Sequence, residues 1–312
     1  MMSWPHSAEL AGALAGAGIG LRAVRARWAG TASALAVEAC FVAVLYTVWQ
    51  IAGGLSLGGA AGAIRRAAGI ERFEHAVRLP SERGLQHLVL DHGWLVQAAN
   101  LYYASMHFAI IFVFLLWLFF RHRQRYGAVR TTLAISTFAC LAIEFVPVAP
   151  PRMMPGFVDT ALRYGQSVYG GGIDADQLSA MPSVHVLWAV IVGWYAVRIG
   201  KSRWRYLAPV HTVLTILVVV ATGNHWWLDG IVAVAVLVAC AWIRAGAVAA
   251  WRAARPAGTA TAPAAVVPVM AAPVMAEPAE AGTGAEIGTP AEAPAGTVAA
   301  APGAVANDIT IV

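Results

Sequence analysis

The sequence predicts an all-α integral membrane protein with about six transmembrane helices, an interfacial amphipathic helix and a disordered C-terminal tail. Three observations support this class. Hydrophobic residues make up 59% of the 312-residue chain and charged residues only 12%, a balance typical of a chain in lipid rather than of a water-covered globule. Several apolar stretches are long enough, or nearly so, to cross a hydrocarbon core of about 30 Å. Basic residues gather in the short segments between those stretches.

The first apolar segment, "ELAGALAGAGIG", is short and Gly-rich and has no basic region before it. It therefore supports neither a signal peptide nor an additional span. We divide the chain into an N-terminal cytoplasmic segment (1–30), a membrane domain (31–250) and a cytoplasmic tail (251–312). The predicted spans are residues 31–51, 98–120, 129–148, 183–200, 207–224 and 227–249.

Two further segments have a distinct pattern. Between the first two spans, "AIRRAAGIERFEHAVRLP" repeats apolar residues at helical spacing with Arg and Glu on the opposite face. This pattern predicts an amphipathic helix that lies in the membrane interface. From Pro256 onward the chain consists mainly of Ala, Pro, Gly, Thr and Val with almost no aromatic residues, so it cannot bury a packed core and is predicted to be disordered.

The distribution of basic residues predicts the orientation. By the positive-inside rule, the side of the membrane that holds most Lys and Arg is cytoplasmic. We therefore expect a multi-pass plasma-membrane protein with both termini in the cytoplasm. The net charge of +5 follows from this topology, and no basic stripe with interleaved aromatic residues indicates a nucleic-acid partner. Fourteen of the 21 Lys and Arg lie on one side of the six spans, in segments 22–27, 121–130, 198–205 and 244–255.

The polar residues that interrupt apolar segments all fall on the opposite, extracytoplasmic side. Arg152 follows the third span, His185 opens the fourth, and His225 with Asp229 lies where the fifth and sixth spans meet. Ionisable groups at membrane depth are costly and usually functional. Three separate segments therefore predict one extracytoplasmic site.

These residue types suit phosphoryl transfer without a metal or cofactor. In "TGNHWWLDG", Asp229 is four residues from His225 and can hold its protonated nitrogen, which leaves the other nitrogen as a nucleophile. In "PSVH", Ser183 and the first N–H groups of the span form an anion site, beside which His185 can donate a proton. Ser183 also suits a helix N-cap. Arg152, in "APPRMMP", offers a forked guanidinium to phosphate oxygens.

The motif "MPSVH", preceded by "VAPPR" and followed about forty residues later by "GNHWWLD", resembles the type 2 phosphatidic acid phosphatase superfamily. It is most similar to the branch with inositol phosphorylceramide synthase-like inositolphosphotransferases, over about Ala63 to Ile243. The resemblance implies that His225 attacks phosphorus to form a phosphohistidine, that Asp229 orients it, and that His185 protonates the leaving group. It also implies that Ser183 and Arg152 bind the phosphate.

Three positions depart from the superfamily pattern. Phe145 stands where the family has a Lys, Met153 where it has a Pro, and Val219 where it has an Arg. With two cationic ligands missing, a phosphodiester donor fits better than a more highly charged monoester. We therefore expect a lipid-phosphate phosphotransferase in contact with membrane lipids. Its donor substrate would be a phospholipid or lipid phosphate, and its acceptor inositol or another polyol. The alternatives are a hydrolase of prenyl or glycerolipid phosphates and a non-catalytic lipid-phosphate carrier, although a carrier does not need a His–Asp pair beside a second His.

Other residues have more than one interpretation. Tyr103 and His107 lie near the outer end of the second span and Asn224 adjoins the predicted nucleophile, so all three are candidate substrate contacts. Interhelical hydrogen bonding explains Tyr103 and His107 equally well. A Zn²⁺ site that includes His185 is the alternative to catalysis, but the motifs offer no obvious further ligand.

Remaining aromatic, acidic and sulfur-bearing residues are assigned ordinary roles. Trp226 and Trp227 are more typical of interfacial anchors than of substrate contacts. The acidic residues of the loop after the third span are interpreted as solvated charges, with contact to an acceptor polyol as the alternative: Asp159, Asp174 and Asp176. The cysteines are interpreted as small buried hydrophobic residues: Cys40, Cys140 and Cys240.

Overall fold

The computed structural model describes residues 4–26, 28–54, 59–167 and 175–254. The predicted disordered tail from Pro256 onward lies outside these residues. The described residues form helices and no strand, with one isolated parallel bridge between Val148 and Ser179. The chain divides into two units, Met1–Arg244 and Ala245–Val312, and every candidate site residue lies in the first. The elements are α1 (Trp4–Ala23), α2 (Ala29–Gly54), α3 (Ala60–Ala76), α4 (Glu82–Leu90), α5 (Gly93–Arg121), α6 (Arg123–Glu144), η1 (Pro151–Met153), α7 (Thr160–Arg163), η2 (Ala175–Leu178), α8 (Val184–Ile199), η3 (Arg203–Tyr206), α9 (Leu207–Ala221) and α10 (Trp227–Ala253).

The predicted class, an all-helical membrane protein, is confirmed. Five of the six predicted spans are helices long and apolar enough to cross a membrane. The third ends at Glu144 rather than 148, because a proline at 147 disfavours helical backbone just before it. The predicted fourth span, α8, has only 16 residues. At 1.5 Å per residue it is about 24 Å long, shorter than a hydrocarbon core of about 30 Å. The five long segments are Ala29–Val48, Gly93–Arg121, Arg123–Glu144, Arg203–Ala221 and Trp227–Ala253.

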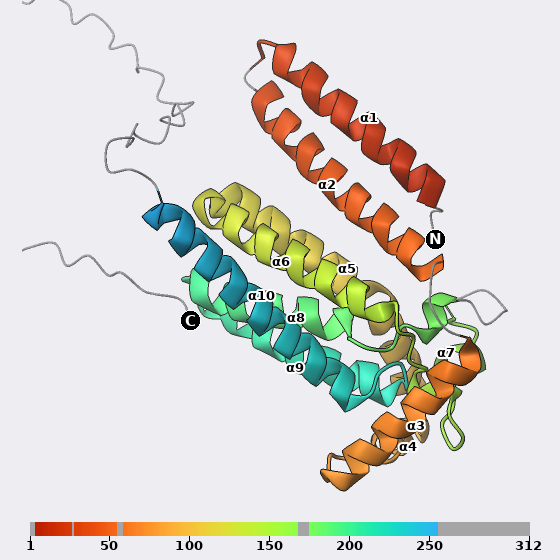
Figure 1. Cartoon of the computed structure of the whole chain (residues 1–312). Helices are drawn as coiled ribbons and strands as arrows, with labels where there is room; N and C mark the ends of the chain where they lie inside the picture. Colours follow the sequence, from red (N-terminus) through yellow and green to blue (C-terminus); the bar gives the residue numbers. More distant parts are fainter. Residues whose placement is uncertain (1–3, 27, 55–58, 168–174, 255–312) are drawn as a thin grey trace, which may run out of the picture. The chain divides into compact units, whose positions relative to one another are not determined.

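The short helix α8 packs at the centre of the bundle. Together with α5, α6 and α10 it forms one apolar core, and α9 runs beside it (Figure 1). Leu187 and Ile191 of α8 are fully buried, as is Leu118 of α5. Because η2 ends at Leu178 and α8 begins only at Val184, residues 179–183 are non-helical, and this segment pairs with the chain after α6 through Val148.

Helices α1 and α2 form an antiparallel hairpin. Ser33 donates to the carbonyl oxygen of Gly18 (2.6 Å), and Thr47 donates to the hydroxyl of Ser7 (2.9 Å). Glu38 of α2 accepts hydrogen bonds from Tyr126 and Arg130 of α6, which joins the hairpin to the bundle. All three cysteines are free thiols; Cys140 is buried and the other two are half-buried.

The segment predicted as an amphipathic helix forms α3, which ends at Ala76, and a second short helix, α4, follows the predicted segment. Arg78 has φ 60° in the connection, and Ser81 caps α4 by accepting a hydrogen bond from the Gly84 N–H. On its buried face, α3 packs Ala63 and Ala67 against a cluster that includes Trp226. The α3–α4 pair thereby lies against the start of α10.

Candidate active site

The imidazole of His225 has a defined tautomer. Its Nδ1 lies 2.7 Å from the carbonyl oxygen of Ala180 and 3.3 Å from Oδ2 of Asp229. Since a carbonyl oxygen only accepts hydrogen bonds, Nδ1 carries the proton and the neutral ring keeps its lone pair on Nε2. Nε2 is buried and has no hydrogen-bond partner among the described residues. The neutral form of His225 therefore has its lone pair on Nε2, the nitrogen that can act as a nucleophile.

Asp229 holds the junction at which α10 begins. Its Oδ2 accepts the N–H of Trp226 (2.7 Å) and contacts Nδ1 of His225. Asp229 is the third residue of α10, a position from which a carboxylate can cap the first turn by accepting the N–H of the residue before the helix. Its backbone carbonyl accepts the N–H of Ser183 (3.1 Å). Asp229 thus connects the histidine to the start of α8, where Ser183 caps the helix by accepting the Val186 N–H (3.3 Å).

His185, in the first turn of α8, lies in a row of rings. Its ring centroid is 5.4 Å from that of His225. On the α5 side it stacks on Tyr103 at 4.4 Å and contacts His107 at 4.1 Å. His107 donates from Nδ1 to the carbonyl of Tyr103 (3.0 Å), which fixes that ring too. The two α5 residues therefore position His185 next to the predicted nucleophile.

Arg152 is anchored from three directions. Its backbone N–H donates to the carbonyl of Gly223 (2.8 Å), Nη1 donates to the side chain of Asn224, and Nε lies 3.4 Å from Asp159. Gly223 permits this approach because it has φ +70°, and a Cβ there would lie 3.0 Å from Gln86 Nε2 and 3.3 Å from the Arg152 nitrogen. The guanidinium is buried and its position is fixed before any ligand binds.

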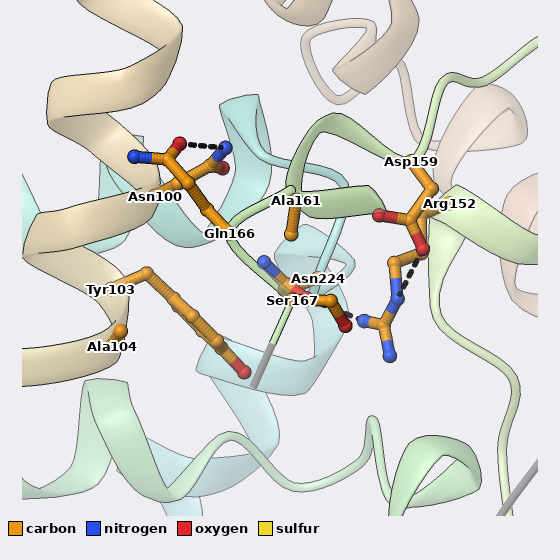
Figure 2. Close-up of a pocket in the computed structure, with 9 residues that line it drawn as sticks. All are labelled: Asn100, Tyr103, Ala104, Arg152, Asp159, Ala161, Gln166, Ser167 and Asn224. Atoms are coloured by element: carbon orange, nitrogen blue, oxygen red, sulfur yellow. Dashed lines mark hydrogen bonds and ion pairs between the residues drawn. The ribbon is translucent and has the colours of Figure 1, made fainter. Parts of the chain in front are cut away.

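The residues around this arginine line a small polar pocket (Figure 2). It lies between α5, η1, the segment around α7 and the connection from α9 to α10. Asn100 donates to Gln166 (3.0 Å) and accepts from Thr160 (2.8 Å), which ties α5 to α7. The lining is mostly neutral and can form hydrogen bonds: Asn100, Tyr103, Ala104, Arg152, Asp159, Ala161, Gln166, Ser167 and Asn224.

A pair of buried carboxyl groups lies behind the site. Glu74 of α3 and Glu82 of α4 are 2% and 5% exposed. Glu74 accepts the N–H of Leu228 in the first turn of α10 (2.7 Å). Burial first, and then the neighbouring Glu82 carboxyl, raise the pKa of Glu74 to about 9. Glu74 is therefore protonated at neutral pH, and its Oε1 accepts the Leu228 N–H at the start of α10.

Within the described part of the chain, no three His, Cys, Asp or Glu side chains lie close enough together to hold a metal ion. The alternative in which His185, His225 and Asp229 bind Zn²⁺ together is thus not supported by their geometry.

Comparison with known proteins agrees with this constellation. A family model described as the PAP2 superfamily matches residues 68–243, more than half of the 312-residue chain. The chain belongs to the PAP2 superfamily. The match covers every predicted site residue, and membership supports a membrane enzyme of the phosphatase type that acts on lipid phosphates. No curated protein and no solved structure matches the chain.

In this PAP2 chain the structure brings the predicted site residues together, with two differences in their contacts. Asn224 holds Arg152 and is itself held by Thr222 (2.8 Å), so its amide acts on the arginine. Tyr103 lines the pocket, whereas His107 contacts His185 instead.

Two ordinary assignments were wrong. Trp226 is not an interfacial anchor: it is 1% exposed and donates to the Ala149 carbonyl (3.0 Å), because the chain before α10 turns it into the core. Asp159 is not a solvated loop charge: it pairs with Arg152 and caps α7. Asp174 and the side chain of Asp176 lie outside the described residues.

Sequence reasoning missed three contributors to the site. The Ala180 carbonyl fixes the His225 ring, Asn100 joins α5 to Thr160 of α7 in the pocket wall, and Glu74 caps α10. The only signal in the sequence was the presence of polar residues, Asn100 and Glu74, in or beside apolar segments.

Proposed function

We propose that this PAP2 protein is a lipid-phosphate phosphotransferase that works through a phosphohistidine on His225 and passes the phosphoryl group to a polyol such as inositol. We assign the chain to the inositol phosphorylceramide synthase-like branch of the superfamily. The observation that carries the proposal is the hydrogen bond from His225 Nδ1 to the Ala180 carbonyl (2.7 Å), because it leaves Nε2 unprotonated beside His185.

In the first half of the cycle, Arg152 and the N-terminus of α8 at Ser183 hold the phosphate of the lipid. Nε2 of His225 attacks phosphorus in line, and the bond from phosphorus to one ester oxygen of the donor breaks; a phosphodiester donor keeps its second ester group on the phosphorus that His225 then holds and passes on. His185 gives its proton to the ester oxygen that leaves. Asp229 and the Ala180 carbonyl stabilise the positive charge that develops on the His225 ring.

In the second half, a hydroxyl group of the acceptor loses its proton to His185 and attacks the phosphohistidine. The His225–phosphorus bond breaks and the ring returns to its starting tautomer. The pocket next to Arg152 has a volume of about 10 Å³, so it admits a single hydroxyl group of an acceptor rather than a whole polyol. The amides that line it are paired with protein groups, and the second lone pairs of their oxygens remain as acceptors for that hydroxyl group.

The environment of the missing cations supports a phosphodiester donor. Val219, which replaces an arginine of the family pattern, is 2% exposed, and its carbonyl accepts the N–H groups of Asn224 and His225. Phe145 is half-buried at the end of α6. A ligand with one negative charge on phosphorus needs less compensation than a monoester with two.

The site opens to the extracytoplasmic side in this proposal. It lies at the end of the bundle where α8 and α10 begin and α6 and α9 end. The basic segments 121–130 and 198–205 lie at the other ends of the same helices, which supports a cytoplasmic location for those segments.

A direct test uses purified protein in lipid nanodiscs with a panel of radiolabelled lipid phosphates and phosphodiesters, with and without inositol. Three proteins are compared: the wild type, His225→Gln and His87→Gln, in which an exposed histidine of α4 is changed as a matched control. A labelled polyol phosphate or phosphoinositide that needs the acceptor and disappears only in His225→Gln supports the transferase.

The other outcomes separate the alternatives. Free phosphate that does not depend on inositol but still depends on His225 identifies a lipid-phosphate hydrolase. Lipid binding without any product in the wild type identifies a carrier.

A further inference from the structure

A second cavity adjoins the segments that hold His225, because Met181 and Leu228 line it. It is a groove of about 340 Å³, within the range of ligand sites at about 300–1,000 Å³. None of the described residues predicted to bind the phosphate lines it. Its walls come from α3, from the chain at the end of α6 and from the two motif segments, and they are mostly apolar: Ile70, Phe73, Ile143, Val146, Met181 and Leu228.

One cation lines this groove. The Nε of Arg66 donates to the carbonyl of Pro147 (2.7 Å), but Nη2 is buried and has no hydrogen-bond partner among the described residues. The guanidinium lies over Gly62, where a Cβ would be 3.4 Å from Nη1. A buried charged donor without a partner is costly, so the site is complete only when an anionic oxygen binds Arg66.

The combination of an apolar groove and one unsatisfied guanidinium selects the occupant. A soluble anion would leave the apolar walls in water, and an uncharged lipid would leave Arg66 without an acceptor. A phospholipid has an acyl chain for the walls and a phosphate for the guanidinium, and in an anionic phospholipid no headgroup cation competes with Arg66 for that phosphate. The amphipathic pattern of α3 predicts that the helix lies at the depth where both parts of a lipid are within reach.

We propose that this groove binds an anionic membrane phospholipid that is not the substrate. The lipid phosphate accepts a hydrogen bond from Arg66, and one acyl chain packs along Ile70, Phe73 and Val146. Met181 follows Ala180 and Leu228 precedes Asp229, so the chain contacts both backbone segments that hold His225 Nδ1. The bound lipid thereby stabilises the site through residues that do not line the Arg152 pocket.

Two variants test the site without disturbing the fold. Gly69 lines the groove inside α3, and a Cβ there meets nothing within 4 Å, so Gly69→Leu fills the groove and also favours the helix. Its matched control is Gly127→Leu, at an equally open glycine of α6. Arg66→Gln removes the cation, with the exposed neighbour Arg65→Gln as its control.

The experiment uses phosphatidylcholine nanodiscs that contain a phosphatidylglycerol with a photoactivatable group in its acyl chain. We expect the wild type and both controls to be labelled on α3 and at the end of α6. Gly69→Leu should lose this labelling, and Arg66→Gln should bind the probe about tenfold more weakly, as expected for one lost hydrogen bond to a charge. The apparent Tm of the wild type should rise when phosphatidylglycerol is present, and neither groove variant should show the rise.

Several results would overturn the proposal. Equal labelling of wild type and Gly69→Leu places the lipid elsewhere, and equal labelling by a phosphatidylcholine probe removes the role of Arg66. Consumption of the phosphatidylglycerol probe by the wild type but not by His225→Gln makes the lipid a substrate. In contrast, groove labelling that persists in an inactive His225→Gln protein supports the groove site, whatever the outcome for the proposed function.

Discussion

The contacts of His225 predict an unusually mild effect for Asp229→Asn. The Ala180 carbonyl lies closer to Nδ1 (2.7 Å) than Asp229 does (3.3 Å), so the carbonyl alone holds the reactive tautomer when the carboxylate is neutralised. The asparagine oxygen can still accept the Trp226 N–H, and its NH₂ group takes the position of Oδ1, which has no partner among the described residues. The fold of the α10 start should therefore be retained.

The magnitude follows from what the substitution removes. A hydrogen bond to a charged group contributes about 1.5–3 kcal/mol, and each 1.36 kcal/mol changes a rate tenfold. We therefore expect Asp229→Asn to lower kcat/KM by about 10- to 150-fold. Where a carboxylate alone fixes the histidine, the amide imposes the wrong tautomer and costs about 10⁴-fold.

The assay measures steady-state turnover of the lipid identified with the nanodisc panel, together with the apparent Tm of the variant as a control for folding. A loss near 10⁴-fold with an unchanged Tm would refute the role given to the Ala180 carbonyl. Full activity would show that Asp229 does not stabilise charge on His225.

Three further predictions concern the surroundings of the site. Gly223→Ala should destabilise the protein by about 1–3 kcal/mol and lower activity, because alanine at φ +70° is strained and its Cβ meets Arg152 and Gln86; thermal unfolding checks this, and a Tm equal to that of wild type contradicts it. Asn224→Ala removes the Nη1 partner of Arg152 and leaves a buried charged donor without it, so KM should rise about tenfold in lipid titrations and apparent Tm should fall; an unchanged KM would mean that Asn224 does not position the arginine. The pKa of Glu74 is raised from 4.5 to about 9, so the folded state holds a proton that the unfolded chain releases, and stability should fall as pH rises through this window. Glu74→Gln should flatten the dependence of Tm on pH, and parallel curves for the two proteins would refute the assignment.

The sequence predicted those parts of the site that are local in the chain. His225 and Asp229 are four residues apart, and Ser183 opens an apolar helix, so periodicity and capping rules identify both motifs. Because the motif helices pack side by side, topology was enough to predict that the motifs converge.

Long-range contacts could not be predicted in the same way. Ala180 is 45 residues from His225 and acts through a backbone oxygen that every residue possesses. Asp159 meets Arg152 only because η1 and α7 fold against the α9–α10 connection. The ends of α8 are local in the same sense as the motifs: the span predicted at 183–200 agrees with Val184–Ile199 within one residue at each end, because the Pro–Ser cap marks where the helix begins.

The most direct test of the central claim is a rapid-quench experiment with the ³²P-labelled lipid substrate in nanodiscs. The account predicts a phosphoprotein that is stable in base and labile in acid, forms within the first turnover, maps to His225 and is absent from His225→Gln. Turnover of the lipid by the wild type without any such species, or a label that persists in His225→Gln, would contradict it.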